Sequence, residues 1–303
     1  MAAETYLVTG ATGFIGAAVA RALAAAGHEV HGVGRGGRGA GAGVTPHACD
    51  LLDAASVQAL IDHVRPTHLV HCAWDVTHNV YWTSPANFDW LAASVALLKA
   101  FQAAGGRRAV GVGTCAEYAA SGTILHETGS PLVPATPYGR CKLSLFHAFE
   151  AARLMGLSTA WGRLFFPYGP GDGERRFLPA LARAMRAGDA FDMSSGAQKL
   201  DFIHIDDVGA AFARLVESDV TRAVNIANGE GVTLREVALR AAEALGRDPA
   251  LLRMGAIAAR ATDPPSLVAD VSRLRDEVGF LPQVPWRQGV ARFVAGSDAA
   301  QPA

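Results

Sequence analysis

The sequence predicts an α/β fold in which a doubly wound parallel sheet carries helices on both faces and a smaller α/β domain is attached to it. Short β-rich apolar runs alternate with alanine- and leucine-rich stretches of helical period, as in parallel strands joined by crossover helices. After about residue 165 the pattern changes, because proline and glycine cluster in PYGPGDGE. Strands are expected near Thr5–Thr9, Glu29–Val33, His68–His71, Arg108–Gly113 and Ser158–Leu164, with a short one before Cys49, and helices near Gly16–Ala26, Ala54–His63, Phe88–Ala104 and Tyr138–Met155.

The same change of pattern divides the chain into two domains. Residues 1–165 and about 199–227 are assigned to the domain of the large sheet, since the run LDFIHIDDVGAAFARLVES returns to its pattern. Residues from about 166 to 198 and from 228 to 296 are assigned to the smaller domain. The glycine-dense stretch Gly32–Gly43 is expected to be a surface loop, and residues 297–303 are expected to be a disordered tail.

Length and charge limit the classes of function. With 303 residues, 50% of them hydrophobic, the chain can bury one large core or two coupled ones. The formal net charge is −1, from 27 basic and 28 acidic residues, which argues against nucleic acid and anionic membranes and favours a small-molecule partner. The start, MAAETYLVTG, lacks the features of a signal peptide, and no apolar run reaches the roughly 18–20 residues of a membrane span. Because Cys49, Cys72, Cys115 and Cys141 form no C-x-x-C pair, neither a metal site nor a disulfide framework is predicted, and a cytoplasmic location is expected.

The stretch Thr9–Gly16, TGATGFIG, follows the first predicted strand and opens the first predicted helix. A turn this tight needs residues without a Cβ, both to reach positive φ and to let the backbone approach a diphosphate at the helix N-terminus. An ordinary glycine-rich turn has the same letters, but its place between strand and helix favours a dinucleotide site. We therefore predict a Rossmann-type domain in which the cofactor is bound by Gly10, Thr12, Gly13, Phe14, Ile15 and Gly16.

The end of the second strand indicates which dinucleotide binds. NAD enzymes of this architecture usually place Asp or Glu there to bind the ribose 2′-hydroxyl, whereas Gly34 and Arg35 stand there in this chain. A guanidinium suits a 2′-phosphate, so NADP(H) is predicted over NAD(H), although Arg35 also fits a solvated loop charge. Asp50 is expected to accept from the adenine amino group or to N-cap the next helix. Leu51 and Ala73 complete the predicted cofactor set.

Tyr138 and Lys142 form a Tyr-x-x-x-Lys pair at the start of a predicted helix. The i,i+4 spacing puts both on one face, and a nearby ammonium lowers the pKa of a phenol from about 10, so that it can exchange a proton with a hydroxyl or carbonyl. A packed tyrosine beside a solvated lysine has the same spacing. Thr114 ends the strand of GVGTCAEY, where the ligand crevice opens, and either orients the same substrate oxygen or caps the strand end.

The chain contains, in this order, the blocks TGATGFIG, CDL, HLVHCAW, GTCAEY, YGRCK, RLFFPYGPG and DFIHIDDV. Together they resemble the signature of the extended short-chain dehydrogenase/reductases, also called the NAD-dependent epimerase/dehydratase family. The resemblance implies that Thr114, Tyr138 and Lys142 are the catalytic set. Tyr138 would exchange the proton while hydride moves to or from nicotinamide C4, Thr114 would orient the substrate oxygen, and Lys142 would bind the nicotinamide ribose. A homodimer through the helices at Phe88–Ala104 and Tyr138–Met155 is also expected.

Departures from the family pattern narrow the reaction. Dehydratases place Asp and Glu directly after the catalytic threonine, where this chain has Cys115 and Ala116, and 4-epimerases typically keep the acidic strand end that is absent at Gly34. We therefore expect an NADPH-dependent reductase of a 4-keto or 4-keto-6-deoxy sugar linked to a nucleotide. The alternatives are a nucleotide-sugar 4-epimerase with tightly held NAD and, from another class, a non-catalytic NADP-binding protein.

The expected substrate contacts depart from the family pattern as well. Leu200 stands where the family supplies an arginine to the sugar diphosphate, and Phe166 replaces an asparagine. Trp90 takes the place of an asparagine that assists the catalytic lysine, unless the register of this helix against the family is shifted by one turn. Arg260 matches the family's C-terminal diphosphate arginine and Arg176 a substrate-loop position, although each also fits a solvated surface arginine. His71 and His204 are expected to be hydrogen-bonded structural residues. The predicted substrate set is Thr114, Cys115, Phe166, Arg176 and Arg260.

Overall fold

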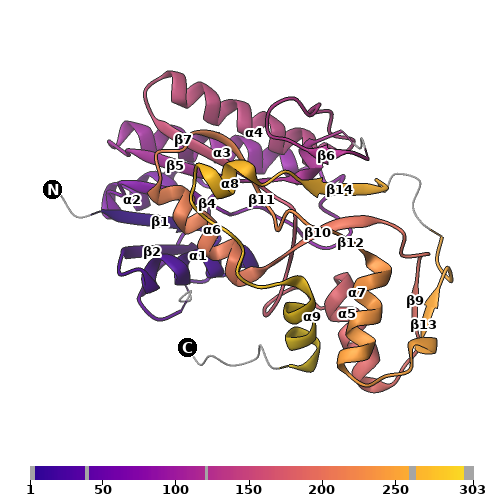
Figure 1. The fold of residues 1–303 in the computed structure, drawn as a ribbon. Coiled ribbons are helices and arrows are strands. Elements are labelled where there is room, and N and C mark those ends of the chain that lie inside the picture. Colours follow the sequence, from indigo (N-terminus) through magenta and orange to yellow (C-terminus); the bar gives the residue numbers. More distant parts are fainter. Residues whose placement is uncertain (1–3, 38–40, 120–121, 259–263, 297–303) are drawn as a thin grey trace.

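The computed structural model describes residues 4–37, 41–119, 122–258 and 264–296 (Figure 1). Seven strands form one parallel sheet in the spatial order β3-β2-β1-β4-β5-β7-β11. The order reverses beside β1, which is where ligands bind in open α/β sheets. The strands are β1 (Thr5–Thr9), β2 (Glu29–Gly34), β3 (Val44–Ala48), β4 (His68–His71), β5 (Arg108–Thr114), β7 (Ser158–Leu164) and β11 (Arg222–Ile226).

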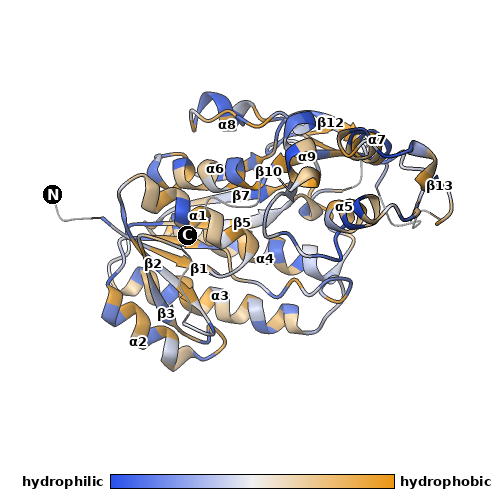
Figure 2. Cartoon of the chain, turned by 90° about the horizontal axis from the view of Figure 1, so that it is seen from below, coloured by the Kyte–Doolittle hydropathy of each residue, from blue (hydrophilic) through white to orange (hydrophobic). Residues whose placement is uncertain are grey.

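Helices cover both faces of the large sheet because side chains alternate along each strand. Val8, Val70 and Val110 pack with α1 (Phe14–Ala25) and α6 (Ile205–Glu217) on one face. Leu7 and Leu69 pack on the other. Figure 2 shows hydrophobic colours on β1 between helices of mixed character. The helices of the second face are α2 (Ala54–Val64), α3 (Ala86–Ala103) and α4 (Pro137–Leu154).

A smaller sheet adjoins the carboxyl edge of the large one and is assembled from distant segments. β10 pairs antiparallel with β12 and parallel with β8 and β14, and β14 pairs with β6. β9 and β13 form a separate parallel pair. A second apolar core joins these strands to three helices. The elements are β6 (Ile124–Leu125), β8 (Phe166–Tyr168), β9 (Phe191–Met193), β10 (Lys199–His204), β12 (Gly231–Thr233), β13 (Leu252–Met254), β14 (Ser266–Ala269), α5 (Phe177–Ala187), α7 (Leu234–Ala244) and α9 (Trp286–Ala295), with η1 (Cys115–Glu117), η2 (Pro249–Leu251) and α8 (Ser272–Asp276) as short helices.

The predicted doubly wound parallel sheet is confirmed, and the predicted helices and strands agree with the observed ones to within two residues at each end. The predicted loop Gly32–Gly43 is wrong at its start. Gly32 and Gly34 belong to β2, because they pair with Pro46 and Ala48 of β3. Residues 38–40 and the predicted tail 297–303 lie outside the described residues.

The division into domains at the predicted residues stays a prediction, and the sheets show where its segments lie. β10 pairs within the smaller sheet, whereas α6, which follows it directly, packs on α1. Leu274 of α8 and Val278 lie in the core of the large sheet. In the parts of the chain that the structure describes, no helix has the length and apolar character to cross a membrane.

Candidate active site

A cleft of about 1170 Å³ opens at the carboxyl ends of β1, β4 and β5. It exceeds the roughly 300–1,000 Å³ of a typical small-ligand pocket, so it has room for a dinucleotide and a second ligand. Asp50 does not line this cleft, and Arg260 lies outside the described residues. The cleft brings together the other predicted site residues, Gly10, Thr12, Gly13, Phe14, Ile15, Gly16, Arg35, Leu51, Ala73, Thr114, Cys115, Tyr138, Lys142, Phe166 and Arg176.

The glycine turn between β1 and α1 is shaped for close backbone approach. Gly10 has a φ of +65°, and a Cβ on it would lie 3.0 Å from the backbone of Ala73. A Cβ on Gly16 would collide with the carbonyl of Gly10, which also accepts the N–H of Gly13 at 2.9 Å. The turn therefore leaves the N-terminus of α1 open to the cleft, where a diphosphate fits. The residues present suit a dinucleotide.

The end of β2 lies at the rim of the same cleft. Arg35 is exposed there. A Cβ on Gly34 would lie 2.8 Å from the Cγ2 atom of Thr12, so a larger side chain at this position would displace Thr12 from the glycine turn. The absence of an acid at Gly34 is thus matched by the packing around it.

The expectation that Asp50 caps the next helix is wrong. Asp53 is the N-cap of α2, and its carboxylate accepts the N–H groups of Ala55 and Ser56. Asp50 is exposed and accepts the N–H of Leu52 at 3.0 Å. An Asp-x-x-Asp run offers two capping residues, and the helix begins at the second. The contact of Asp50 with adenine stays a prediction.

Tyr138 lies in the first turn of α4, which begins after the N-cap Thr136. Its phenol is buried beside the side chain of Thr114. Burial raises the pKa of Tyr138 well above its usual value, and the neighbouring Thr114 opposes this effect. The direction is opposite to the lowering expected from the sequence, because the loss of water dominates at this position.

Lys142 is 3% exposed, one turn further along α4. Its Nζ atom donates to the carbonyl of Val112 at 3.0 Å and lies 4.1 Å from the ring centre of Trp74. Burial lowers the pKa of Lys142 to about 8, while Glu117 and Cys72 act in the opposite direction. The ammonium is therefore held in a nearly dry place beside β5.

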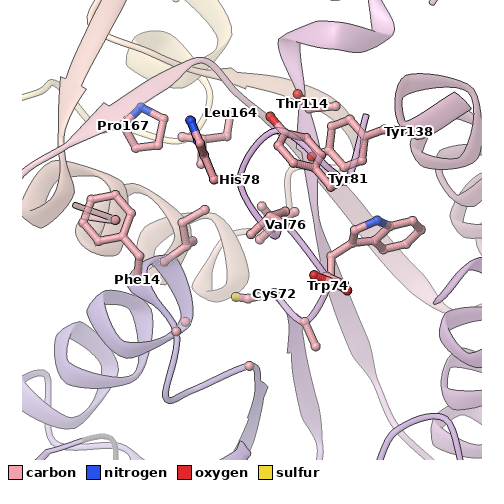
Figure 3. A pocket seen from close by; sticks show the side chains of 18 of the residues that line it. Phe14, Cys72, Trp74, Val76, His78, Tyr81, Thr114, Tyr138, Leu164 and Pro167 are labelled. Carbon is pink, nitrogen blue, oxygen red and sulfur yellow. The ribbon is translucent and has the colours of Figure 1, made fainter. Parts of the chain in front are cut away.

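Three rings from the segment between β4 and α3 surround Tyr138, and we call Trp74, Tyr81 and Trp82 the aromatic wall. Their ring centres lie 6.3, 4.8 and 5.6 Å from that of Tyr138, all nearly perpendicular to it. Figure 3 shows Tyr81 and Tyr138 side by side next to Thr114, with Trp74 nearby. The carbonyl of Trp82 accepts the N–H of Tyr138 at 3.2 Å.

Asn87, near the start of α3, holds the aromatic wall in place. It is 2% exposed, and its Nδ2 atom donates to the carbonyls of Tyr81 at 2.7 Å and Ser84 at 2.9 Å. Its Oδ1 atom accepts the indole N–H of Trp74 at 2.9 Å. Sequence reasoning missed Asn87 and the aromatic wall. The signal was the density of tryptophan after HLVHCAW, with Asn87 one turn before Trp90, which lines the cleft beside Trp74.

A buried ion pair between Glu117 and Arg163 fixes the backbone of Thr114. Oε1 of Glu117 accepts the N–H of Thr114 at 2.9 Å, and Oε2 accepts Nε of Arg163 at 2.8 Å. Neither charged side chain is accessible to water. The indole of Trp161 donates to the same carboxylate at 3.0 Å. Sequence reasoning missed this pair, although Glu117 lies in GTCAEY and Arg163 in RLFFPYGPG.

The predicted substrate residues Cys115, Phe166 and Arg176 line the same cleft. Cys115 is buried in η1, and burial raises its pKa to about 12, so the thiol is neutral. Phe166 of β8 lines the cleft. Arg176 is half-exposed and pairs with Asp172 at 3.2 Å. Leu200 is buried in the second core opposite Val232 and Leu267, so no cation enters the cleft from its position.

Both histidines singled out in the sequence are hydrogen-bonded within the fold. His71 is buried, with Thr9 Oγ1 and Ser94 Oγ each at 2.8 Å from its ring nitrogens. Burial lowers the pKa of His71 to about 3, so the ring is neutral. His204 caps α6 by accepting the N–H of Asp206 at 3.3 Å. These contacts agree with the structural roles expected of them.

The parallel sheet, the glycine turn and the Thr–Tyr–Lys cleft define a dinucleotide-dependent enzyme of the short-chain dehydrogenase/reductase class. The chain belongs to the NAD dependent epimerase/dehydratase family, whose model matches residues 6–227. It is 28% identical to a dTDP-4-dehydro-6-deoxy-D-allose reductase of Streptomyces sp, covering 95% of this chain and 94% of that protein. It is 26% identical to a UDP-glucose 4-epimerase of Rhizobium leguminosarum bv. trifolii, covering 93% and 94%.

Solved structures agree with this assignment. The UDP-glucose 4-epimerase of Thermus thermophilus in complex with NAD superposes with a TM-score of 0.86 at 25% identity, covering 98% of this chain and 100% of that one. The family and these relatives indicate an oxidoreductase or epimerase that uses a nicotinamide dinucleotide.

Proposed function

We propose that this chain is an NADPH-dependent reductase of a 4-keto sugar linked to a nucleotide, with or without oxygen at C6. The observation that carries the proposal is the convergence of Thr114, Tyr138 and Lys142 in one cleft with the glycine turn. The end of β2 at the same cleft has Gly34 and Arg35 and no acid, which favours a 2′-phosphate over a free ribose hydroxyl.

When bound, the dinucleotide supplies hydride to the carbonyl carbon. Tyr138 donates the proton to the carbonyl oxygen as it becomes an alcohol, and Thr114 donates a hydrogen bond that orients this oxygen. Because burial raises the pKa of Tyr138, the phenol keeps its proton, which suits an acid in the direction of reduction. Lys142 binds the nicotinamide ribose and returns the tyrosine to its protonated form.

The relatives support two reactions. One Streptomyces relative is a dTDP-4-dehydro-6-deoxy-D-allose reductase, and several others are UDP-glucose 4-epimerases. A 4-epimerase with tightly held NAD is therefore the second candidate, favoured by the NAD-bound neighbour from Thermus thermophilus. The raised pKa of Tyr138 and the absence of an acidic residue at position 34 favour the reductase.

The deciding experiment follows absorbance of NADPH with a panel of 4-keto nucleotide sugars. A reductase consumes NADPH and keto-sugar in equal amounts, whereas an epimerase interconverts two sugars without net oxidation. Tyr138→Phe is expected to lower kcat by about 10²–10⁴-fold and to keep the affinity for NADPH. Interconversion of two sugars with no loss of NADPH would contradict the reductase and support the 4-epimerase.

We also propose a homodimer through α3 and α4. Large apolar side chains are exposed along these helices, with Phe88 68% and Leu154 79% accessible, which is unusual for a solvated face. Size-exclusion chromatography with light scattering tests this: a mass near twice 31.6 kDa is expected, and Phe88→Glu should reduce it. A mass of one chain at micromolar concentration contradicts the proposal.

A further inference from the structure

The ammonium of Lys142 rests on an aromatic face. Its Nζ atom has the carbonyl of Val112 on one side at 3.0 Å and the ring of Trp74 on the other, 4.1 Å from the ring centre. A cation over an indole face is attracted by the negative face of the ring, and the attraction grows when water is excluded, as it is for this 3% exposed side chain. The indole face of Trp74 thus attracts the ammonium of Lys142 without using the indole N–H.

The indole is itself fixed at its opposite edge. The N–H of Trp74 donates to Oδ1 of Asn87 at 2.9 Å, and Asn87 is held by the carbonyls of Tyr81 and Ser84. Trp90, from the next turn of α3, packs beside the indole with ring centres 6.3 Å apart. The plane under Lys142 is therefore set by α3 and the segment before it, not by α4, which carries the lysine.

We propose that Trp74 is a positioning residue of the reaction, whose indole face, fixed by Asn87, holds the ammonium of Lys142 beside Tyr138 and against the end of β5. The inference rests on the proposed function, because Lys142 is there assigned to the ribose and to the protonation of Tyr138. A lysine has four rotatable bonds and no preferred partner geometry. An aromatic plane on one side and a carbonyl on the other limit where the charge can lie.

Burial shifts the pKa values of His71, Cys72 and Tyr138, which lie near Lys142, away from that of Lys142. His71 of β4 has its pKa lowered to about 3 by burial, and Cys72 has its pKa raised to about 12, so both are uncharged at neutral pH. Glu117 of η1 is held in its ion pair with Arg163. A change in the titration of Lys142 when only the ring of Trp74 is altered therefore reports the indole face.

The direct test measures the pKa of Lys142 by NMR of isotopically labelled lysine, which is tractable because the chain contains Lys99, Lys142 and Lys199 as its lysines. Tryptophans with increasing numbers of ring fluorines are placed at position 74, which weakens the negative face while keeping the shape. The pKa of Lys142 is expected to fall stepwise, by about one over the series. The same series at Trp90 is the matched control and should leave this pKa unchanged. A constant pKa across the series at position 74 overturns the proposal.

Kinetics provide a second measurement on the same protein. Trp74→Phe loses the bond to Asn87 but keeps an aromatic face under Lys142. Its kcat is therefore expected to stay within about threefold of wild type, whereas Trp74→Leu removes the face and is expected to lower kcat about tenfold. Equal losses in Trp74→Phe and Trp74→Leu, with both variants folded by circular dichroism, contradict a role for the face.

The two hypotheses fail separately. The NMR titration needs no substrate, so a protein that turns over no keto-sugar but shows the stepwise fall in the pKa of Lys142 contradicts the proposed function and supports the role of Trp74. A protein that reduces keto-sugars but whose Lys142 keeps a constant pKa across the series at position 74 supports the proposed function and contradicts the role of Trp74.

Discussion

At the scale of single residues, the chemistry of the cleft depends on how far water is excluded from Tyr138 and Lys142. Burial moves both groups toward their neutral forms: it raises the pKa of Tyr138 and lowers that of Lys142 to about 8. The two neutral forms have different consequences, because a neutral phenol can still donate a proton whereas a neutral amine has lost the charge that assists it. The working pH range is therefore limited from above.

Activity and stability should change in opposite directions above neutral pH. As pH rises through about 8, Lys142 loses its proton in the folded protein, and kcat/KM is expected to fall. The pKa of Lys142 in the folded protein lies below its unfolded value of about 10.4. Between these two values the unfolded chain binds more protons, so the lysine's contribution to the free energy of unfolding rises with pH. Steady-state kinetics and urea unfolding between pH 7 and 10 check both signs, and Lys142→Met should abolish the stability trend.

The choice of cofactor is expected to depend on Arg35. Arg35→Ala removes the guanidinium at the rim of the cleft and should weaken NADPH binding by about 10–100-fold, with little change for NADH. Fluorescence titration of both cofactors measures the ratio. Arg140, exposed on α4, is a matched control, and Arg140→Ala should leave the ratio as it is. Tighter binding of NADH that Arg35→Ala leaves unaltered would contradict an NADP preference.

At the scale of secondary-structure elements, the end of β5 is held by the short helix that follows it. Thr114 is the N-cap of η1, and the carboxylate of Glu117 accepts the N–H of Thr114, so that the two residues form a capping box. The same carboxylate is buried against Arg163 of β7, the next strand. Two neighbouring strands are thereby tied at the point where Thr114 enters the cleft.

Breaking this ion pair should damage both stability and turnover. Glu117→Gln leaves Arg163 buried without a counter-charge and is expected to lower the free energy of unfolding by about 3–5 kcal/mol. Urea unfolding measures this loss. Glu150→Gln, at a partly exposed pair with Arg153 on α4, is the control and should cost no more than about 1 kcal/mol. A loss in Glu117→Gln as small as in the control would mean that the pair does not hold β5.

The elements themselves were predictable because their apolar residues repeat with the period of a strand or a helix. The glycine turn and the Tyr138–Lys142 pair were predictable because each lies at the end of such an element. The aromatic wall was not, because Trp74, Tyr81 and Trp82 lie in a segment without period between β4 and α3. Their contacts with Tyr138 join positions far apart in the sequence, and no local pattern records such contacts. The raised pKa of Tyr138 was not predictable either, because it results from burial by these distant residues.

At the scale of the whole molecule, the cleft lies between two apolar cores. Cys115 and Phe165, which follow strands of the large sheet, belong to the second core, and Leu274 and Val278, from the C-terminal region, belong to the core of the large sheet. Each core therefore contains side chains from segments that otherwise belong to the other sheet. We expect the two cores to unfold together.

A single substitution in the smaller sheet tests this cooperativity. Leu200→Ala removes a side chain that is 7% exposed in the second core and is expected to lower the free energy of unfolding by about 2–5 kcal/mol. Tryptophan fluorescence, dominated by the four tryptophans of the large-sheet half (Trp74, Trp82, Trp90 and Trp161), and circular dichroism should report one common midpoint. Leu239→Ala, 38% exposed on α7, should cost less than Leu200→Ala. Two separate transitions in the variant would show independent halves.

The smaller sheet also sets when the enzyme can become functional during synthesis. Its strands come from β6, β8, β10, β12 and β14, so its last member leaves the ribosome about 140 residues after its first. Pairing over such separations is slow, and Leu274 and Val278, which complete the core of the large sheet, also come after β11. A nascent chain should therefore acquire its cofactor site and its substrate site together and late, and its unpaired strands would need protection from aggregation until then.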